Sequence, residues 1–110
     1  MELLVLILNK VELLDDVLSF YVEAGVSGAT VIDSVGMGRI IATMPIFAGF
    51  RDLMVGNRPS NKTVLAVVDS AMVPGIAEGI GKIVGPLSEP GTGLLFTVPV
   101  TSIQGLGKGF

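Results

Sequence analysis

The order of apolar and polar positions divides the chain into alternating segments with the periods of strands and helices. Residues 3–8 are an unbroken aliphatic run, which is typical of a strand buried on both faces and therefore central in its sheet. Residues 63–68 repeat this pattern. Residues 29–35 are rich in β-branched side chains, and residues 94–100 belong to an uncharged run with a strand-like pattern, so we expect strands there too.

A helix is predicted between the first two strands. Apolar residues recur at spacings of three and four from Leu14 to Tyr21, which gives one apolar stripe. Asn9, with Glu12 three positions later, has the spacing of a capping box at the start of this helix. Gly25 is expected to end it.

A second helix is predicted from Asp69 or Ser70, either of which can cap it, to about Val84. Pro74 falls in the first turn, where a missing N–H is tolerated. Three glycines interrupt this helix and either permit close packing or lower its intrinsic stability by roughly 1 kcal/mol each. They are Gly75, Gly79 and Gly81.

The order of strand, helix, strand, long loop, strand, helix and strand predicts a single α+β domain over residues 1–110. It is the β-α-β-β-α-β order of the ferredoxin-like sandwich, with the long loop between strands 2 and 3. The first and third strands lie in the middle of that sheet, in agreement with the two aliphatic runs. Many unrelated functions use this fold, so function has to be argued from particular residues.

The connection over residues 40–61 lacks clear periodicity although much of it is apolar. So long a connection in a small domain is uncommon and usually functional. Either it contains a short helix or hairpin that packs on the core, or it is a docking surface for a partner. Under the second interpretation Phe47 and Phe50 are the expected anchors, with Met44 and Leu53 beside them.

Composition adds the expectation of an assembly. Half of the residues are apolar and only 15% are charged, against about a quarter charged in an average domain. We therefore expect apolar surface to be covered by other subunits or reserved for a partner. The formal net charge of −3 argues against a nucleic acid as partner.

Candidate chemistry is limited because the chain has no cysteine and no histidine. Disulfides, thiolate catalysis, the usual zinc ligands and the usual neutral-pH general base are thereby excluded. The carboxylates of Asp15 and Asp16 lie at a helix start and that of Glu89 in a turn, so neither an enzyme nor a metal site is expected. The sequence pattern predicts neither a secretory signal nor a membrane span, so a cytoplasmic protein is expected.

Two glycine-bearing stretches are candidates for holding an anion. Gly36 and Gly38 flank Met37 and allow close approach to the backbone, while Arg39 supplies a fixed positive charge. The alternative is a strand end that turns into a loop. A second such stretch, residues 91–93, precedes the last strand.

These stretches carry a resemblance to a known family. Residues 24–31 followed by Gly36-Met37-Gly38-Arg39 resemble the second strand and T-loop base of the PII signal-transduction (nitrogen regulatory) proteins. Residues 90–96 resemble the family's B-loop running into the fourth strand. The resemblance implies a homotrimer with nucleotide sites between subunits and a T-loop that contacts targets such as membrane transporters. It implies an effector site formed by two subunits, from Thr30, Gly36, Gly38 and Arg39 of one with Gly91, Thr92 and Gly93 of the other.

The chain also departs from the family pattern. Glu89 and Leu94 stand where the family has phosphate-binding lysines, and glycines stand where it has C-terminal arginines. The family's modified tyrosine is absent, because the single tyrosine, Tyr21, lies on the first helix. Two functions follow. The first is a PII-like regulator that binds a small anionic effector, such as ATP, ADP or AMP, between subunits and controls a target protein through residues 40–61; ligands with fewer phosphates are expected to compete well there. The second is a ligand-free trimeric adaptor that presents residues 40–61 as an apolar docking loop.

Overall fold

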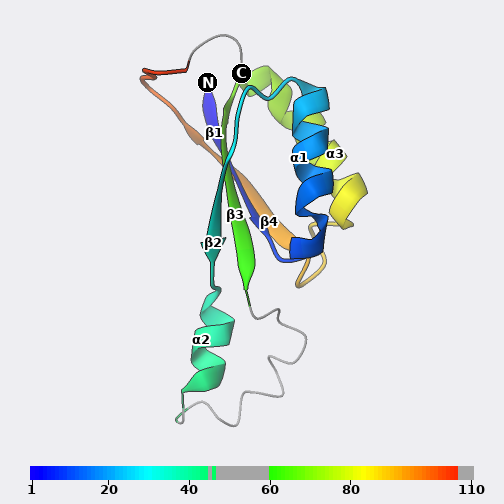
Figure 1. The fold of residues 1–110 in the computed structure, drawn as a ribbon, viewed down its shortest axis with the longest axis vertical. Helices are drawn as coiled ribbons and strands as arrows, with labels where there is room; N and C mark the ends of the chain where they lie inside the picture. The colour runs from blue at the N-terminus through cyan, green and yellow to red at the C-terminus, as the bar shows by residue number, and fades with distance from the viewer. Residues whose placement is uncertain (45, 47–59, 107–110) are drawn as a thin grey trace.

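The computed structural model describes residues 1–44, 46 and 60–106. In this part of the chain one four-stranded antiparallel sheet and three α-helices form an α+β fold. The elements in order are β1 (Glu2–Leu8), a 3-10 turn (Val11–Leu13), α1 (Leu14–Ala24), β2 (Thr30–Ser34), α2 (Met37–Thr43), β3 (Asn61–Val68), a 3-10 turn (Ser70–Met72), α3 (Val73–Val84) and β4 (Gly93–Pro99). Figure 1 shows α1 and α3 together beside the sheet, and α2 beyond the end of β2.

The strand order in the sheet is β2-β3-β1-β4. The prediction that the two aliphatic runs are the central strands is therefore confirmed, and β2 and β4 form the edges. The register fixes the two ends of the sheet. At one end Leu8 of β1 lies opposite Lys62 of β3 and Gly93 of β4, and at the other end Glu2 lies opposite Val68 and Pro99.

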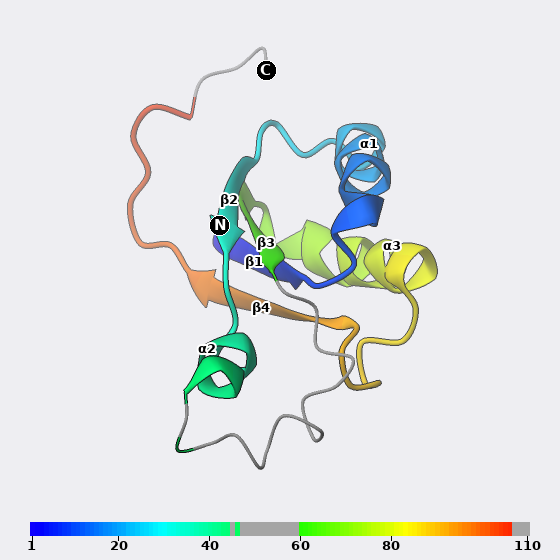
Figure 2. The same ribbon diagram turned by 60° about the horizontal axis from the view of Figure 1, so that its bottom comes forward.

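The two faces of the sheet differ in their covering. On the face toward α1 and α3, Leu4, Leu6 and Leu8 of β1 are completely buried. Figure 2 shows both helices on this side of the sheet. The helices contribute buried side chains to the same core, namely Val17, Tyr21, Ile76, Ile80 and Val84.

The opposite face is apolar but not covered by the described elements. Of its central positions, Val5 is buried with 7% exposed, whereas Leu3, Ile7 and Leu65 are half-buried. Along β4 the exposed fractions are 57% for Leu94 and 43% for Phe96. The aliphatic runs predict that the central strands are buried on both faces. In the single chain this burial is complete on the face toward the helices and only partial on the opposite face.

The ends of α1 agree with the sequence only in part. Helical structure begins with a 3-10 turn at Val11, and neither this turn nor α1 has a side-chain hydrogen bond at its cap, so the capping role predicted for Asn9 is wrong. Gly25 ends α1 as predicted, with a left-handed φ of 89°. The N–H groups of Gly25 and Val26 donate to the carbonyls of Val22 (3.2 Å) and Tyr21 (2.9 Å), a Schellman pattern.

Close packing between α1 and α3 depends on one of the three glycines in α3. A Cβ built on Gly79 would lie 2.0 Å from Cζ of Phe20, so the Phe20 ring occupies the space of the missing side chain. A Cβ on Gly75 or Gly81 would meet nothing within 4 Å. Gly79 therefore permits the helix contact, while the other two glycines only reduce helix propensity.

The start of the segment 40–61 belongs to α2, in agreement with the interpretation that this segment contains a short helix, but that interpretation also placed the helix on the core. None of the residues described for α2 belongs to the buried core, and both views place the helix away from α1 and α3. Met44, directly after α2, is 40% exposed. Phe47, Phe50 and Leu53 lie outside the described residues.

Candidate functional site

The two glycine-bearing stretches lie at the same end of the sheet. Ser34, the last residue of β2, lies opposite Asn61, and α2 begins three residues later at Met37. Gly93, the first residue of β4, lies opposite Leu8. However, β2 and β4 are opposite edges, with β3 and β1 between them. Three strand spacings of about 4.8 Å separate the two edges by roughly 14 Å. In one chain the two stretches therefore do not form a single small-ligand site.

Thr30 lies apart from the other candidate residues. It is the first residue of β2, and its partner on β3 is Leu65, near the middle of that strand. With a rise of about 3.3 Å per residue, Thr30 lies roughly 13 Å along the strand from Ser34. The structure thus groups Gly36, Gly38 and Arg39 around the start of α2 and leaves Thr30 at the other end of β2.

Gly36 and Arg39 are exposed at the β2 edge, and Gly38 is half-buried. Gly36 precedes α2 in an extended conformation with a φ of −76°, which other residues adopt easily. A Cβ at Gly36 would lie 3.6 Å from Nδ2 of Asn61, an ordinary contact distance. The backbone shape at Gly36 therefore does not require glycine.

Backbone shape does require glycine in the stretch before β4. Gly91 has a φ of 79°, and Gly93 has a φ of 150° with its missing Cβ only 2.7 Å from the Ile7 carbonyl oxygen. Thr92 between them is 4% exposed. In the single chain this stretch thus offers backbone groups and the rim of the turn, rather than the Thr92 side chain, to a ligand.

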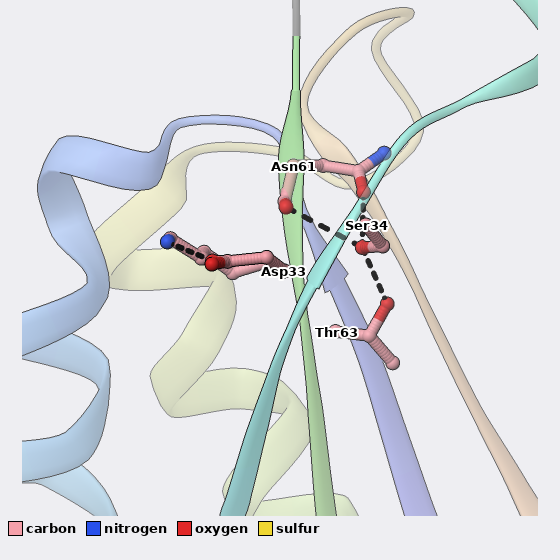
Figure 3. A network of polar contacts seen from close by, with 5 residues as sticks. Asp33, Ser34, Asn61 and Thr63 are labelled. Carbon is pink, nitrogen blue, oxygen red and sulfur yellow. Dashed lines mark hydrogen bonds and ion pairs between the residues drawn. The ribbon is translucent and has the colours of Figure 1, made fainter.

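A polar network that the sequence did not reveal joins β2 to β3 beside α2. The hydroxyl groups of Ser34 and Thr63 lie 2.8 Å apart, and the Ser34 hydroxyl also donates to the backbone carbonyl of Asn61 (3.4 Å) and to its side-chain oxygen. Figure 3 shows this cluster on one side of the two strands and the Asp33–Lys62 ion pair on the other.

The alternation of the strands explains this arrangement, because successive side chains point to opposite faces of a sheet. The two ends of the connection between β2 and β3 are therefore held together on both faces. The sequence signal that could have revealed this network is Ser34 near the end of one predicted strand, together with the polar residues 61–63 at the start of the next.

Positive charge at this end of the sheet is partly engaged within the chain. Lys62 pairs with Asp33, and Lys10 donates to the carbonyl oxygen of Val84 at 2.7 Å, where it neutralises the end of α3. Arg39 is exposed. Glu89, in the turn before β4, adds negative charge. Among the described residues, a triphosphate, with about four negative charges, would find few cations here.

Comparison of the sequence with protein-family models and with curated proteins found no match. None of the helices in residues 1–44, 46 and 60–106 has the length and apolar character needed to cross a bilayer. In the same residues no cluster of three or more acidic side chains is arranged to hold a metal ion.

Proposed function

We propose that this protein is a PII-like regulator with a ferredoxin-like fold. It forms a homotrimer in the cytoplasm, binds a small anionic effector between subunits, and acts on a target protein through residues 40–61. The β2-β3-β1-β4 order with α1 and α3 on one face supports the ferredoxin-like assignment. The long connection between β2 and β3 has the position of the PII T-loop.

The uncovered apolar face of the sheet is the observation that carries the proposal. It presents Phe96, Leu94 and Val98 from β4, with exposed fractions of 43%, 57% and 43%. Ile32 of β2 adds a fourth exposed apolar side chain, at 44%. Exposed apolar surface of this kind costs about 25 cal/mol per Å² relative to burial, and copies of the same chain would cover it symmetrically.

Assembly would also bring the two glycine-bearing stretches into one site. They lie at the same end of the sheet but at opposite edges, so the Arg39 stretch of one subunit can approach the 91–93 stretch of its neighbour when sheets pack side by side. Arg39 would supply the charge and the glycine backbone the N–H groups. Because few cations of residues 1–44, 46 and 60–106 are near, ADP or AMP is expected to compete well with ATP.

The output would come from α2 and the residues that follow it. In α2, Met37 is 73% and Ile40 is 48% exposed, and Met44, directly after the helix, is 40% exposed, so this short helix and the residue after it present apolar side chains to solvent. A target with an apolar docking surface, such as a membrane transporter, is the proposed partner. The predicted anchors Phe47, Phe50 and Leu53 follow in the sequence, outside the described residues.

A ligand-free trimeric adaptor is the second candidate. It is favoured by the ion pair that occupies Lys62 and by the burial of Thr92, since both reduce what the site offers to an anion. In that case the trimer would only present the 40–61 segment.

Calorimetric titration with ATP, ADP and AMP distinguishes the two candidates. The regulator is supported if an adenine nucleotide binds and Arg39→Ala weakens the binding by about tenfold or more. Lys82→Ala is the matched control, because Lys82 pairs with Glu78 on α3. If the protein is a trimer but binds none of the three nucleotides, the regulator is excluded and the ligand-free adaptor is the candidate that is left. If light scattering gives a monomer mass at micromolar concentration, both candidates fail.

A further inference from the structure

The apolar side chains of α2 form one stripe along the helix. Met37, Ile40 and Ile41 of α2 and Met44 directly after it follow each other at spacings of three and four, which places them on one face. Ile41 is half-buried and the other three are exposed. Ile46, shortly after the helix, is 82% exposed, more than any other large apolar side chain described.

Arg39 gives α2 a positive charge on its other side. At about 100° per residue, Arg39 falls roughly opposite Met37 and Met44 around the helix axis. The residue is exposed, and the sequence of α2 contains no acidic residue. The helix is therefore amphipathic, with an apolar face and a cation on the polar face.

The charge of the chain is distributed unevenly around this helix. Residues 35–60, which connect β2 to β3, contain three of the seven basic residues but only one of the ten acidic ones. The connection therefore carries a net charge of +2, although the whole chain carries −3. An anionic surface attracts this part of the chain and repels the rest, so charge favours an orientation with α2 toward such a surface.

The position of α2 leaves it accessible to a surface as broad as a membrane. Figure 1 shows the helix beyond the end of β2, along the longest axis of the structure, and Figure 2 shows it apart from α1 and α3. The helix has 7 residues and is about 10 Å long. A hydrocarbon core of about 30 Å is too thick for it to cross. It can therefore contact a bilayer only at the surface.

We propose that α2 docks on an anionic lipid bilayer. Met37, Ile40, Met44 and Ile46 enter the boundary between headgroups and acyl chains, and Arg39 faces the lipid phosphates. A bilayer requires apolar side chains and a cation but no complementary shape, and the described residues of α2 offer these two features. The contact adds a lipid surface to the partners of the output segment. It depends neither on the trimer nor on an effector.

A single fluorescent label tests the contact directly because the chain has no cysteine. Ile46→Cys carries an environment-sensitive fluorophore, and Val22→Cys on α1, where Val22 is 77% exposed, is the matched control. Vesicles of phosphatidylglycerol and phosphatidylcholine should shift the emission of the Ile46 label to shorter wavelength and leave the Val22 label unchanged. Vesicles of phosphatidylcholine alone should give a much smaller shift, and added salt should reduce the shift with anionic vesicles.

Co-sedimentation with the anionic vesicles measures the affinity of unlabelled variants. Met37→Asp should weaken binding by about tenfold or more, because an anion replaces an apolar side chain in the contact. Aspartate suits the first turn of a helix, so α2 should be retained. Val22→Asp is the matched control and should change the affinity by less than about twofold.

Arg39→Gln tests the charge separately from the apolar contact. Loss of one cation at an anionic surface should weaken binding by about fivefold. Binding to phosphatidylcholine alone should be unchanged. These measurements are made without nucleotide, because Arg39 also belongs to the proposed effector site.

The proposal is overturned if the protein does not bind anionic vesicles at millimolar lipid, if the two labels shift alike, or if Met37→Asp and Val22→Asp have the same effect. A protein would then be the partner of α2. Nucleotide titration and light scattering are independent of these measurements. A trimer that binds a nucleotide but no vesicle would overturn this inference and leave the proposed function in place.

Discussion

Ser34 and Thr63 face each other across β2 and β3 with their hydroxyl oxygens 2.8 Å apart, next to the point where the chain leaves the sheet for α2. On the other face of the same strands, Asp33 pairs with Lys62. A segment proposed to signal to a partner is thus anchored at its base by side chains from both strands.

Ser34→Ala is expected to loosen this base. The substitution removes the hydroxyl that links Thr63 and Asn61, at a cost of about 1 kcal/mol. Amide hydrogen exchange should become faster at the adjoining ends of β2 and β3 and stay unchanged in β1. Ser19→Ala on the exposed side of α1 is the control. Equal exchange in both variants would mean that the network does not hold the strand ends.

Phe96→Glu tests whether the uncovered face of the sheet is a subunit interface. Phe96 is 43% exposed in the single chain, so a charge there should be tolerated by the monomer but not in an apolar interface. Light scattering should report a monomer for this variant and a trimer for the parent. Val22→Glu, at a position 77% exposed on α1, should leave the mass unchanged. A trimer in both variants would place the interface elsewhere.

Gly79→Ala is expected to destabilise the protein although alanine is the better helix former. The added Cβ would lie 2.0 Å from Cζ of Phe20, and the ring would have to leave its place between the helices. Overpacking of this kind costs about 1–3 kcal/mol, more than the roughly 1 kcal/mol gained in helix propensity. Denaturant unfolding measures the difference.

The helix α3 supplies its own control for this prediction. Gly81→Ala meets nothing within 4 Å and should stabilise the chain. Combining Gly79→Ala with Phe20→Leu should relieve much of the clash. If Gly79→Ala instead stabilises as much as Gly81→Ala, the Phe20 ring does not need the space above Gly79.

The pH dependence of stability should show the burial of Tyr21. Its pKa is raised to about 12 in the folded chain, against about 10 for an exposed tyrosine. The folded state therefore holds the proton more tightly than the unfolded state. Stability is unaffected by this group below about pH 10 and falls as the pH rises toward 12. The absorbance of the single phenolate gives the pKa of Tyr21, and denaturant unfolding at a series of pH values gives the loss of stability. A Tyr21 pKa near 10 in the folded chain would contradict the burial.

The double substitution Phe47→Ser and Phe50→Ser tests the proposed output segment. If these residues dock a target, their loss should abolish target binding and leave the melting temperature nearly unchanged. Binding is measured with the target retained on a column, and melting by circular dichroism. Unfolding of the variant, or loss of the trimer, would assign both phenylalanines to the core instead.

The sequence by itself determined the order of the four strands with α1 and α3 and the place of the central strands. The unbroken aliphatic runs of β1 and β3 can be satisfied only inside a sheet, and the glycine at position 25 marks a helix end because few other residues adopt its left-handed backbone. These signals are local. They depend on the spacing of apolar side chains along the chain and on the backbone conformations that a residue type can adopt, and both can be read from the sequence.

The tertiary structure alone decided features that join distant residues. The space above Gly79 exists only because Phe20 of another helix fills it, and the glycines at 75 and 81 look the same in the sequence. The separation of Arg39 from Gly91 and Gly93 follows from the strand order, which places their strands at opposite edges. The buried hydroxyl of Tyr21 depends likewise on how α1 lies against the sheet, because burial is a property of the whole packed layer and not of the residue's neighbours in sequence.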